Sequence, residues 1–375
     1  MILKNGDYKQ LADRIKTGGN KVIVYGAGMI GQIIIPHLIS KYNISDNIDC
    51  FIDVDPRKEG QSVTLGDYSY EIKTPDYLHK KHEKTILLIT NSKFFPVIRF
   101  LDGIKELDDV EGYIIPMMQI YELQHAKAIQ IEKYSDQPLI PKIINYCWFG
   151  KKEMPPFLQK CIASWRNFCP DYEIICWNED NYDVNKYTFT KQAYEQKKYG
   201  FVTDLARLDI LYEHGGIYMD TDVTLVKNLD DMLFQEGFTG VEKWGNINTG
   251  GGCGFVPGHP MLKEMIDYRK QYSFVLEDGS LNIETNGMYE TKPFLLHSFN
   301  PDNSLQRVNG VTVYPPYVLH PYDYMSCELH EKISTYSIHH FYGGWMEEDD
   351  RLNRTKTQDA YMEIVYRVNN GGLPL

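Results

Sequence analysis

The segment GGIYMDTDV, residues 215–223, places two carboxylates, Asp220 and Asp222, inside an otherwise apolar run that contains no basic residue. The run predicts a buried strand over 217–226, and residues two apart in a strand project from the same face. Adjacent carboxylates repel each other and are costly to bury without a counter-charge. A divalent cation would remove both costs, and oxygen ligands favour Mn²⁺ or Mg²⁺. At a strand end, a diphosphate could share that metal.

A helix is predicted directly before this strand, over 201–213, because apolar side chains recur along one stripe. Gly215 and Gly216 end it. Asp204 and Arg207 lie three apart on the helix and therefore share a face. Taken alone, this pair would be a surface ion pair of little energy, and the two aspartates a solvated strand end or turn.

Together these residues form a more specific pattern. The segment DLARLDILYEHGGIYMDTDV resembles the signature of DXD-containing sugar transferases of the capsular-polysaccharide type, glycosyltransferase family 32, which also occurs in large clostridial glucosylating toxins. IPKIINYCWFG, with Trp148, resembles that family's first strand, and SIHHFYGGW its closing His-rich segment. The resemblance covers residues 139–350 and implies an α/β fold of the type called GT-A. The positions that match the signature are Asp204, Arg207, Gly215, Gly216, Tyr218, Asp220 and Asp222.

The resemblance also implies a role for each matched side chain. Asp222 would ligate the metal directly, whereas Asp220 would contact the ribose or sugar of a nucleotide-sugar donor and help to hold the metal. Asp204 and Arg207 would bind hydroxyls of the donor hexose. Trp148 would stack on the nucleobase, for which a flat apolar face is suited. The alternative for Trp148 is an ordinary core tryptophan.

The closing segment adds a third metal ligand. His339 and His340 are adjacent, so in a strand they face opposite ways and only one can reach the metal; His339 is favoured. Gly343 and Gly344 would bring backbone close to the diphosphate, and Trp345 would donate its indole N–H to it. The family often has a serine where Gly344 stands, so a hydroxyl contact to phosphate must come from elsewhere.

The first third of the chain alternates strand and helix patterns, which predicts a parallel α/β sheet. After the first predicted strand, GAGMIG supplies Gly26, Gly28 and Gly31 in the spacing GxGxxG. Glycines there allow a diphosphate to approach a helix N-terminus, and Asp53 ends the next strand, where an acid would hold a ribose hydroxyl. The predicted strands are 21–25, 48–53, 85–90 and 113–115.

Two interpretations of this glycine loop stay open. One is a site for NAD or another nucleotide; the other is an ordinary tight turn between a strand and a helix. The expected domain is short and has too few strands for a full dinucleotide site. The segment CFIDVDPRKEG resembles small Rossmann-like domains of bacterial polysaccharide-biosynthesis enzymes, which implies the fold more than a bound nucleotide.

These patterns predict an α/β protein of two domains, as its 375 residues suggest. A small Rossmann-like domain with a parallel sheet is expected over 1–120. A linker helix follows over 121–137, where SDQP breaks the chain. The GT-A type α/β domain takes up 138–375.

Composition narrows the possible partners and the cellular compartment. The formal net charge of −12 argues against a broad electrostatic contact with nucleic acid. Seven scattered cysteines without a CxxC pair predict reduced thiols in a cytoplasmic protein. The N-terminus has no long apolar stretch, so a cleaved signal peptide is not expected. The sequence does not determine three further properties: a location at the inner face of the membrane, peripheral membrane contact and homo-oligomerisation.

The resulting expectation is a retaining, metal-dependent transfer of a hexose from a nucleotide sugar to a saccharide or lipid-linked saccharide, in bacterial surface polysaccharide synthesis. UDP-sugars are favoured as donors and GDP-mannose is next; the sugar, acceptor and linkage are not determined by the sequence. One alternative is an NAD-dependent sugar-nucleotide oxidoreductase or epimerase, for which Tyr194 and Lys198 have the Tyr-x-x-x-Lys spacing. The other is a non-catalytic nucleotide-sugar sensor.

Overall fold

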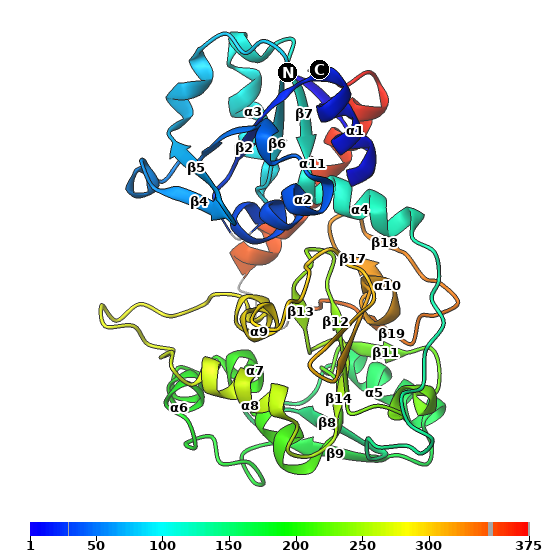
Figure 1. Cartoon of the computed structure of the whole chain (residues 1–375). Helices are drawn as coiled ribbons and strands as arrows, with labels where there is room; N and C mark the ends of the chain where they lie inside the picture. Colours follow the sequence, from blue (N-terminus) through cyan, green and yellow to red (C-terminus); the bar gives the residue numbers. More distant parts are fainter. Residues whose placement is uncertain (29, 344–347, 374–375) are drawn as a thin grey trace. The chain divides into compact units, whose positions relative to one another are not determined.

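The computed structural model describes residues 1–28, 30–343 and 348–373, which form two compact units (Figure 1). Unit 1 comprises Met1–Ala126, Met325–Cys327 and Glu348–Leu375, and unit 2 comprises Lys127–Tyr324 and Glu328–Glu347. Both units combine helices with sheets that contain parallel strands, which confirms the predicted α/β class.

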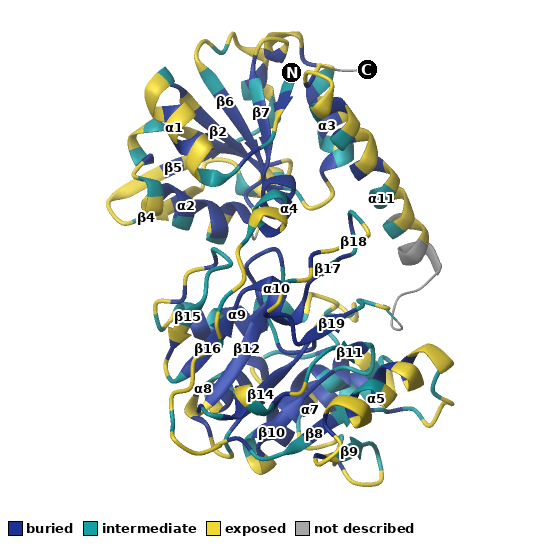
Figure 2. Ribbon diagram, turned by 90° about the vertical axis from the view of Figure 1, so that its right-hand side faces the viewer, coloured by how far each residue is buried: buried dark blue, intermediate teal, exposed yellow. Residues whose placement is uncertain are grey.

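Unit 1 is built on a seven-stranded sheet in the order β1-β7-β6-β2-β3-β5-β4. All neighbours are parallel except the β4–β5 hairpin at one edge. The central strands KVIVY and TILLI are almost entirely buried, as expected of a parallel sheet covered on both faces (Figure 2). The strands are β1 Ile2–Lys4, β2 Lys21–Tyr25, β3 Ile48–Ile52, β4 Ser62–Leu65, β5 Tyr68–Lys73, β6 Thr85–Ile89 and β7 Glu111–Ile114. The helices are α1 Tyr8–Gly18, α2 Ile35–Tyr42, α3 Phe94–Asp102, α4 Ile115–His125 and α11 Glu348–Asn369.

The four strands predicted for this part of the chain are present as β2, β3, β6 and β7. The expectation of too few strands is wrong, because β1 and the β4–β5 hairpin extend the sheet on both sides. Neither has a strong sequence signal: β1 is three residues long, and half of the residues in the hairpin strands are exposed. The linker helix predicted over 121–137 is also wrong, since α4 ends at His125 and residues 126–140 contain no helix.

The helix α11 belongs to unit 1, although residues 138–375 are predicted to form the second domain. Arg367 on this helix pairs with Asp102, with Nη1 2.6 Å from Oδ2. Its Nη2 donates to the carbonyl of Met1 at 2.6 Å. Tyr361 and Ile364 are buried. A distant ion pair and a buried face thus attach the chain's last helix to its first strand, which no local pattern reveals.

Unit 2 contains a mixed sheet in the order β15-β16-β12-β14-β10-β8-β9, with β13 paired to β12, and two small two-stranded sheets, β11-β19 and β17-β18. The strands of that order are β8 Ile143–Cys147, β9 Glu173–Trp177, β10 Gly216–Tyr218, β12 Gly237–Val241, β14 Cys253–Phe255, β15 Gln306–Val308 and β16 Val311–Tyr314. The remaining strands are β11 Val223–Leu225, β13 Ile247–Asn248, β17 Tyr322–Asp323, β18 Glu328–Leu329 and β19 Ser337–His339. The helices are α5 Pro156–Phe168, α6 Thr188–Glu195, α7 Tyr199–His214, α8 Pro260–Arg269, α9 Asn286–Leu295 and α10 Pro316–Leu319.

Helix α7 is the central helix of unit 2. It packs against β8, β10 and β14 and also against α6 and α8. Its residues from Phe201 to Leu211 are buried almost without interruption, including the charged Asp204, Arg207 and Asp209. The predicted apolar stripe is therefore only part of its buried surface, because neighbours cover several faces. This burial is what makes its charged residues candidates for function.

All seven cysteines are free thiols, and six of them are buried or half-buried. Within the described part of the chain, no helix has both the length and the apolar character required to cross a bilayer.

Candidate active site

Asp220 and Asp222 lie in a turn between β10 and β11, so the single strand predicted over 217–226 is wrong. β10 is paired with β8 and β14 inside the large sheet, whereas β11 pairs with β19. The backbone explains the break: Asp220 N–H donates to the Gly250 carbonyl at 2.8 Å, and Val223 N–H donates back to the Asp220 carbonyl at 3.1 Å. The turn, not strand alternation, brings the two carboxylates together.

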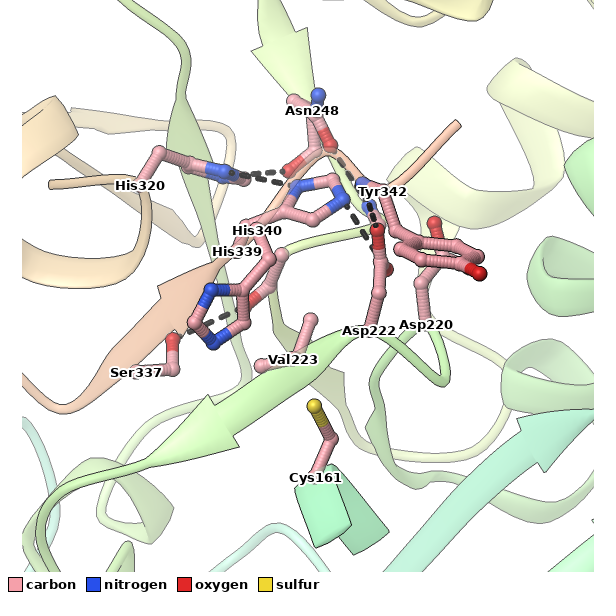
Figure 3. A network of polar contacts seen from close by, with 12 residues as sticks. Cys161, Asp220, Asp222, Val223, Asn248, His320, Ser337, His339, His340 and Tyr342 are labelled. Atoms are coloured by element: carbon pink, nitrogen blue, oxygen red, sulfur yellow. Dashed lines mark hydrogen bonds and ion pairs between the residues drawn. The ribbon is translucent and has the colours of Figure 1, made fainter. Parts of the chain in front are cut away.

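Asp222 is held by strand β19 and the residues that follow it (Figure 3). His339 Nε2 lies 3.4 Å from Asp222 Oδ1, and Tyr342 N–H donates to Oδ2 at 2.7 Å. Burial disfavours charge on Asp222, but the charge of His339 and its hydrogen bond outweigh burial and lower the pKa to about 2. Burial likewise opposes charge on His339, yet attraction to Asp222 raises the pKa of that imidazole. Asp222 is therefore an anion with a histidine able to balance it.

The neighbouring histidine faces the other way, as adjacent residues of a strand should. His340 Nε2 lies 2.8 Å from the hydroxyl of Thr224. On the inner side, His339 Nδ1 is 3.4 Å from His320 Nδ1, and the ring of Phe341 stacks on His339 at 4.1 Å between centroids. The geometry thus places His339, the favoured residue of the pair, beside Asp222.

Asp220 belongs to a second charged group, formed with helix α7. Arg207 Nη2 lies 3.1 Å from Asp204 Oδ1 and 3.3 Å from Asp220 Oδ1. The side chains of Arg207 and Asp204 are only 6% and 11% exposed, which excludes a solvated surface pair. Burial raises the pKa of Asp204 to about 6, although Arg207 opposes the shift. The Tyr218 hydroxyl also donates to Asp220 Oδ1, at 2.9 Å.

The donor set fits a divalent cation. One ligand atom each from Asp220, Asp222 and His339 lie within 4.8 Å of one another. Two carboxylates and an imidazole suit Mn²⁺, while carboxylates alone would also suit Mg²⁺. The apolar run itself carries no basic residue, but the fold brings basic side chains from distant segments, Arg207 to Asp220 and His339 to Asp222.

The loop after β13 closes tightly on these groups. A Cβ at Gly250 would lie 2.3 Å from Asp220 Oδ2 and 3.0 Å from Arg207 Nη1, so only glycine fits there. Asn248 Oδ1 accepts the Gly250 N–H at 2.9 Å. The sequence predicts only Gly-rich and Asn-rich loops in this region.

The other predicted donor-binding residues lie just after β8 and in the segment that follows β19. Trp148 is half-buried just after β8, and its Nε1 donates to the Lys152 carbonyl at 2.7 Å. Gly343 directly follows Tyr342 and has a positive φ of 64°. Gly344 and Trp345 lie outside the residues that the structure describes.

In unit 1, the glycine loop is held closed by its own acid. Asp53 Oδ2 accepts the Ala27 N–H at 2.9 Å and pairs with Lys58 Nζ at 2.9 Å. A Cβ at Gly31 would lie 2.0 Å from the Gly26 carbonyl oxygen, whereas one at Gly28 would meet nothing within 4 Å. Gly31 therefore serves close packing, and Asp53 stabilises the turn.

The two residues of the alternative proton relay are not in the same unit as the glycine loop. Tyr194 and Lys198 belong to unit 2, whereas the glycine loop belongs to unit 1. The Tyr194 hydroxyl donates to Glu179 Oε1 at 3.0 Å.

Several residues of this site carry no signal in the sequence. Thr249 contacts Arg207, with Oγ1 3.4 Å from Nη1, and Glu290 in turn binds Thr249. His320 reaches the Asn248 carbonyl at 3.2 Å. These side chains come from a loop, from helix α9 and from the residue after α10, all distant in sequence from the two aspartates, so only folding reveals their proximity.

Comparison with known proteins gives a consistent result. The family described as "Glycosyltransferase sugar-binding region containing DXD motif" matches residues 155–239, which include α7 and the aspartate turn. Inositol phosphoceramide mannosyltransferase 3 of Schizosaccharomyces pombe is 29% identical over 170 residues, covering 44% of this chain and 46% of that protein. Mannosyl phosphorylinositol ceramide synthase CSH1 of Saccharomyces cerevisiae is 31% identical over 151 residues, covering 37% of this chain and 38% of that protein.

A viral protein is matched over more of its own length. The uncharacterized glycosyltransferase L373 of Acanthamoeba polyphaga mimivirus is 25% identical over 218 residues, covering 54% of this chain and 85% of that protein. Among solved structures, the PaToxG glycosyltransferase covers 42% of this chain and 68% of that chain, with 19% identity and a TM-score of 0.34. The chain spans less than half the length of the yeast mannosyltransferases named above. The matched region supports a glycosyltransferase that contains a DXD motif.

Proposed function

We propose that unit 2 is a metal-dependent glycosyltransferase that moves a hexose from a nucleotide sugar to a saccharide or lipid-linked acceptor. One observation carries the proposal: candidate ligand atoms of Asp220, Asp222 and His339 lie within 4.8 Å of one another. The buried Asp204–Arg207 pair adjoins Asp220. This arrangement supports a cation site beside a charged site for sugar hydroxyls, as a diphosphate-linked sugar requires.

Asp222, Asp220 and His339 would hold Mn²⁺ or Mg²⁺, which when bound acts as a Lewis acid on the leaving diphosphate. Asp204 can accept hydrogen bonds from sugar hydroxyls, and Arg207 can donate to them. Because both are buried, these bonds form in a region of low dielectric, where they orient the hexose strongly.

The rest of the donor would contact the residues around this centre. Trp148 is half-buried and offers a ring face to a nucleobase. Gly343 would allow the diphosphate to approach the backbone, and the assignment of Gly344 and Trp345 to diphosphate binding rests on the motif resemblance alone. The same resemblance implies retention of the α configuration. We propose attack on the same face, assisted by the leaving phosphate.

The donor base and the acceptor are narrower proposals. UDP-sugars follow from the motif resemblance. The name of one yeast relative, inositol phosphoceramide mannosyltransferase 3, supports testing GDP-mannose beside UDP-sugars as the donor and supports a lipid-linked acceptor. Bacterial surface polysaccharide synthesis remains our proposed setting from the capsular-type resemblance.

The test is a thermal-shift comparison of UDP-glucose and GDP-mannose, each with and without Mn²⁺, followed by hydrolysis without acceptor. A bound donor raises the melting temperature by mass action. An enzyme shows metal-dependent release of the sugar, whereas a sensor shows the shift without turnover. A shift with NAD in place of a nucleotide sugar would favour the oxidoreductase alternative.

A further inference from the structure

Glu290, on helix α9, is a buried carboxylate with no role in the site described so far. It is only 1% exposed. Its oxygens accept the Thr249 backbone N–H at 2.9 Å, the Thr249 hydroxyl, and Asn286 Nδ2 at 2.5 Å. Because protein donors surround this carboxylate and no exposed surface remains, Glu290 is unsuited to attack a sugar directly. Its contacts suit a positioning role instead.

The hydroxyl of Thr249 has a defined direction in this arrangement. A hydroxyl has one hydrogen and two acceptor lone pairs. Since Thr249 donates its hydrogen to Glu290, its oxygen is left to accept from Arg207 Nη1, which lies 3.4 Å away. The guanidinium of Arg207 can only donate hydrogen bonds, so the direction of both bonds, from Arg207 to Thr249 and from Thr249 to Glu290, is fixed.

This series of hydrogen bonds, from Glu290 through Thr249 to Arg207, ends at the candidate donor site. Arg207 Nη2 lies 3.1 Å from Asp204 and 3.3 Å from Asp220. A free arginine side chain loses much rotamer freedom when it is fixed, so a second anchor on Nη1 favours one orientation in advance. The loop that carries Thr249 also accepts the Asp220 N–H through Gly250.

We infer that Glu290 is a positioning residue that fixes Arg207 in its donor-binding orientation through the hydroxyl of Thr249. The inference rests on the donor-binding role that the proposed function gives to Arg207.

Three variants separate this role from general structure. Glu290→Gln keeps the size of the side chain but turns one acceptor into an NH₂ group, which then faces Thr249 N–H or Asn286 Nδ2, both donors. Thr249→Val keeps the shape and removes the hydroxyl. Thr249→Ser keeps the hydroxyl and is the matched control.

Calorimetry with Mn²⁺ measures UDP-glucose and GDP-mannose against free UDP and GDP. The pH is kept above the pKa of Glu290, which burial raises to about 7. Glu290→Gln and Thr249→Val are expected to weaken binding of the nucleotide sugar by about 5- to 30-fold and to spare the free diphosphate. Thr249→Ser should bind both ligands like the unmodified protein. Equal losses for both ligands would overturn the inference.

A double-mutant cycle then tests the route through Arg207. In an Arg207→Ala background, Glu290→Gln should cause no further loss of nucleotide-sugar affinity. Additive losses would show that Glu290 acts independently of Arg207, against the inference.

Failure of the proposed function gives a distinct result. If neither nucleotide sugar binds the unmodified protein, the proposed donors are wrong. Crystal structures of the variants then test whether Glu290 positions Arg207. The guanidinium of Arg207 should be displaced in Thr249→Val and stay in place in Thr249→Ser. An unmoved guanidinium in both variants overturns the inference, even if Glu290→Gln does not fold.

Discussion

His339 Nε2 lies 3.4 Å from Asp222 Oδ1, although the two residues come from distant parts of unit 2. The register of two short strands brings them together, because β11 and β19 are antiparallel with Val223 opposite His339. Each residue shifts the pKa of the other toward its charged form. The candidate metal site is therefore assembled by strand pairing, not by the spacing of the aspartates alone.

Replacing Asp222 with asparagine should abolish metal-dependent donor binding and leave the protein folded. The amide cannot supply an anionic ligand, and His339 loses its counter-charge. We expect stability to fall by about 1–3 kcal/mol, the usual cost of weakening a buried charged hydrogen bond. Calorimetric titration with Mn²⁺ and GDP-mannose or UDP-glucose, together with urea unfolding, checks both parts.

The matched control for this change is Asp180→Asn, which removes an exposed aspartate of the same unit that pairs with Lys151. It should leave both properties unchanged. Manganese-dependent turnover that persists in Asp222→Asn would rule out the assignment of the metal site.

Trp148→Ala should weaken binding of the nucleoside diphosphate and of the nucleotide sugar to the same extent. A lost stacking face costs roughly 1–3 kcal/mol by analogy with stacked bases elsewhere. Trp148→Phe retains a ring face and should recover most of the affinity. If both variants bind the two ligands normally, the tryptophan only shapes the loop through its hydrogen bond to Lys152.

Unit 2 alone should cleave a nucleotide sugar, because every residue given a catalytic role belongs to it. A fragment of residues 127–347 is expected to fold better than one of residues 135–375. The longer fragment would leave Arg367 of helix α11 without Asp102 and would expose the buried face of that helix. Hydrolysis without acceptor and circular dichroism of both fragments test this. A folded 127–347 fragment without activity under any metal condition would show that unit 1 takes part in the chemistry.

The contribution of two buried carboxyl groups to the free energy of unfolding should fall as the pH rises from about 4.5 toward 7. Burial raises the pKa of Glu290 to about 7 and that of Asp204 to about 6. These two groups bind more protons in the folded protein than in the unfolded chain in this window, so their contribution to stability decreases with rising pH. In urea unfolding measured across the window, Glu290→Gln should remove this fall and so make the slope of stability against pH more positive, whereas Glu213→Gln, at an exposed position of the same unit, should not. An unchanged slope in Glu290→Gln would mean that this carboxyl is already ionised in acid.

Much of the fold follows from local patterns in the sequence. Helix α7 and the strands β2, β3, β6 and β7 lie within a few residues of their predicted bounds. Apolar periodicity and glycine punctuation act over a few residues, which is the range that such patterns report. Strand β1 and helix α11 escaped prediction because their pairing partners lie far along the chain, with Arg367 bound to Asp102 and to Met1.

The sequence by itself determined which side chains are candidates for the chemistry: the pair Asp220 and Asp222, the pair Asp204 and Arg207, and His339. Only the tertiary structure decided how they meet. The aspartates share a turn instead of a strand face, Arg207 balances Asp220, and His339 balances Asp222. The physical reason is that buried charges must find partners, and those partners come from whichever segments the fold brings close. Residues such as Glu290 and Thr249, which act on the site through others, become visible only when that packing is known.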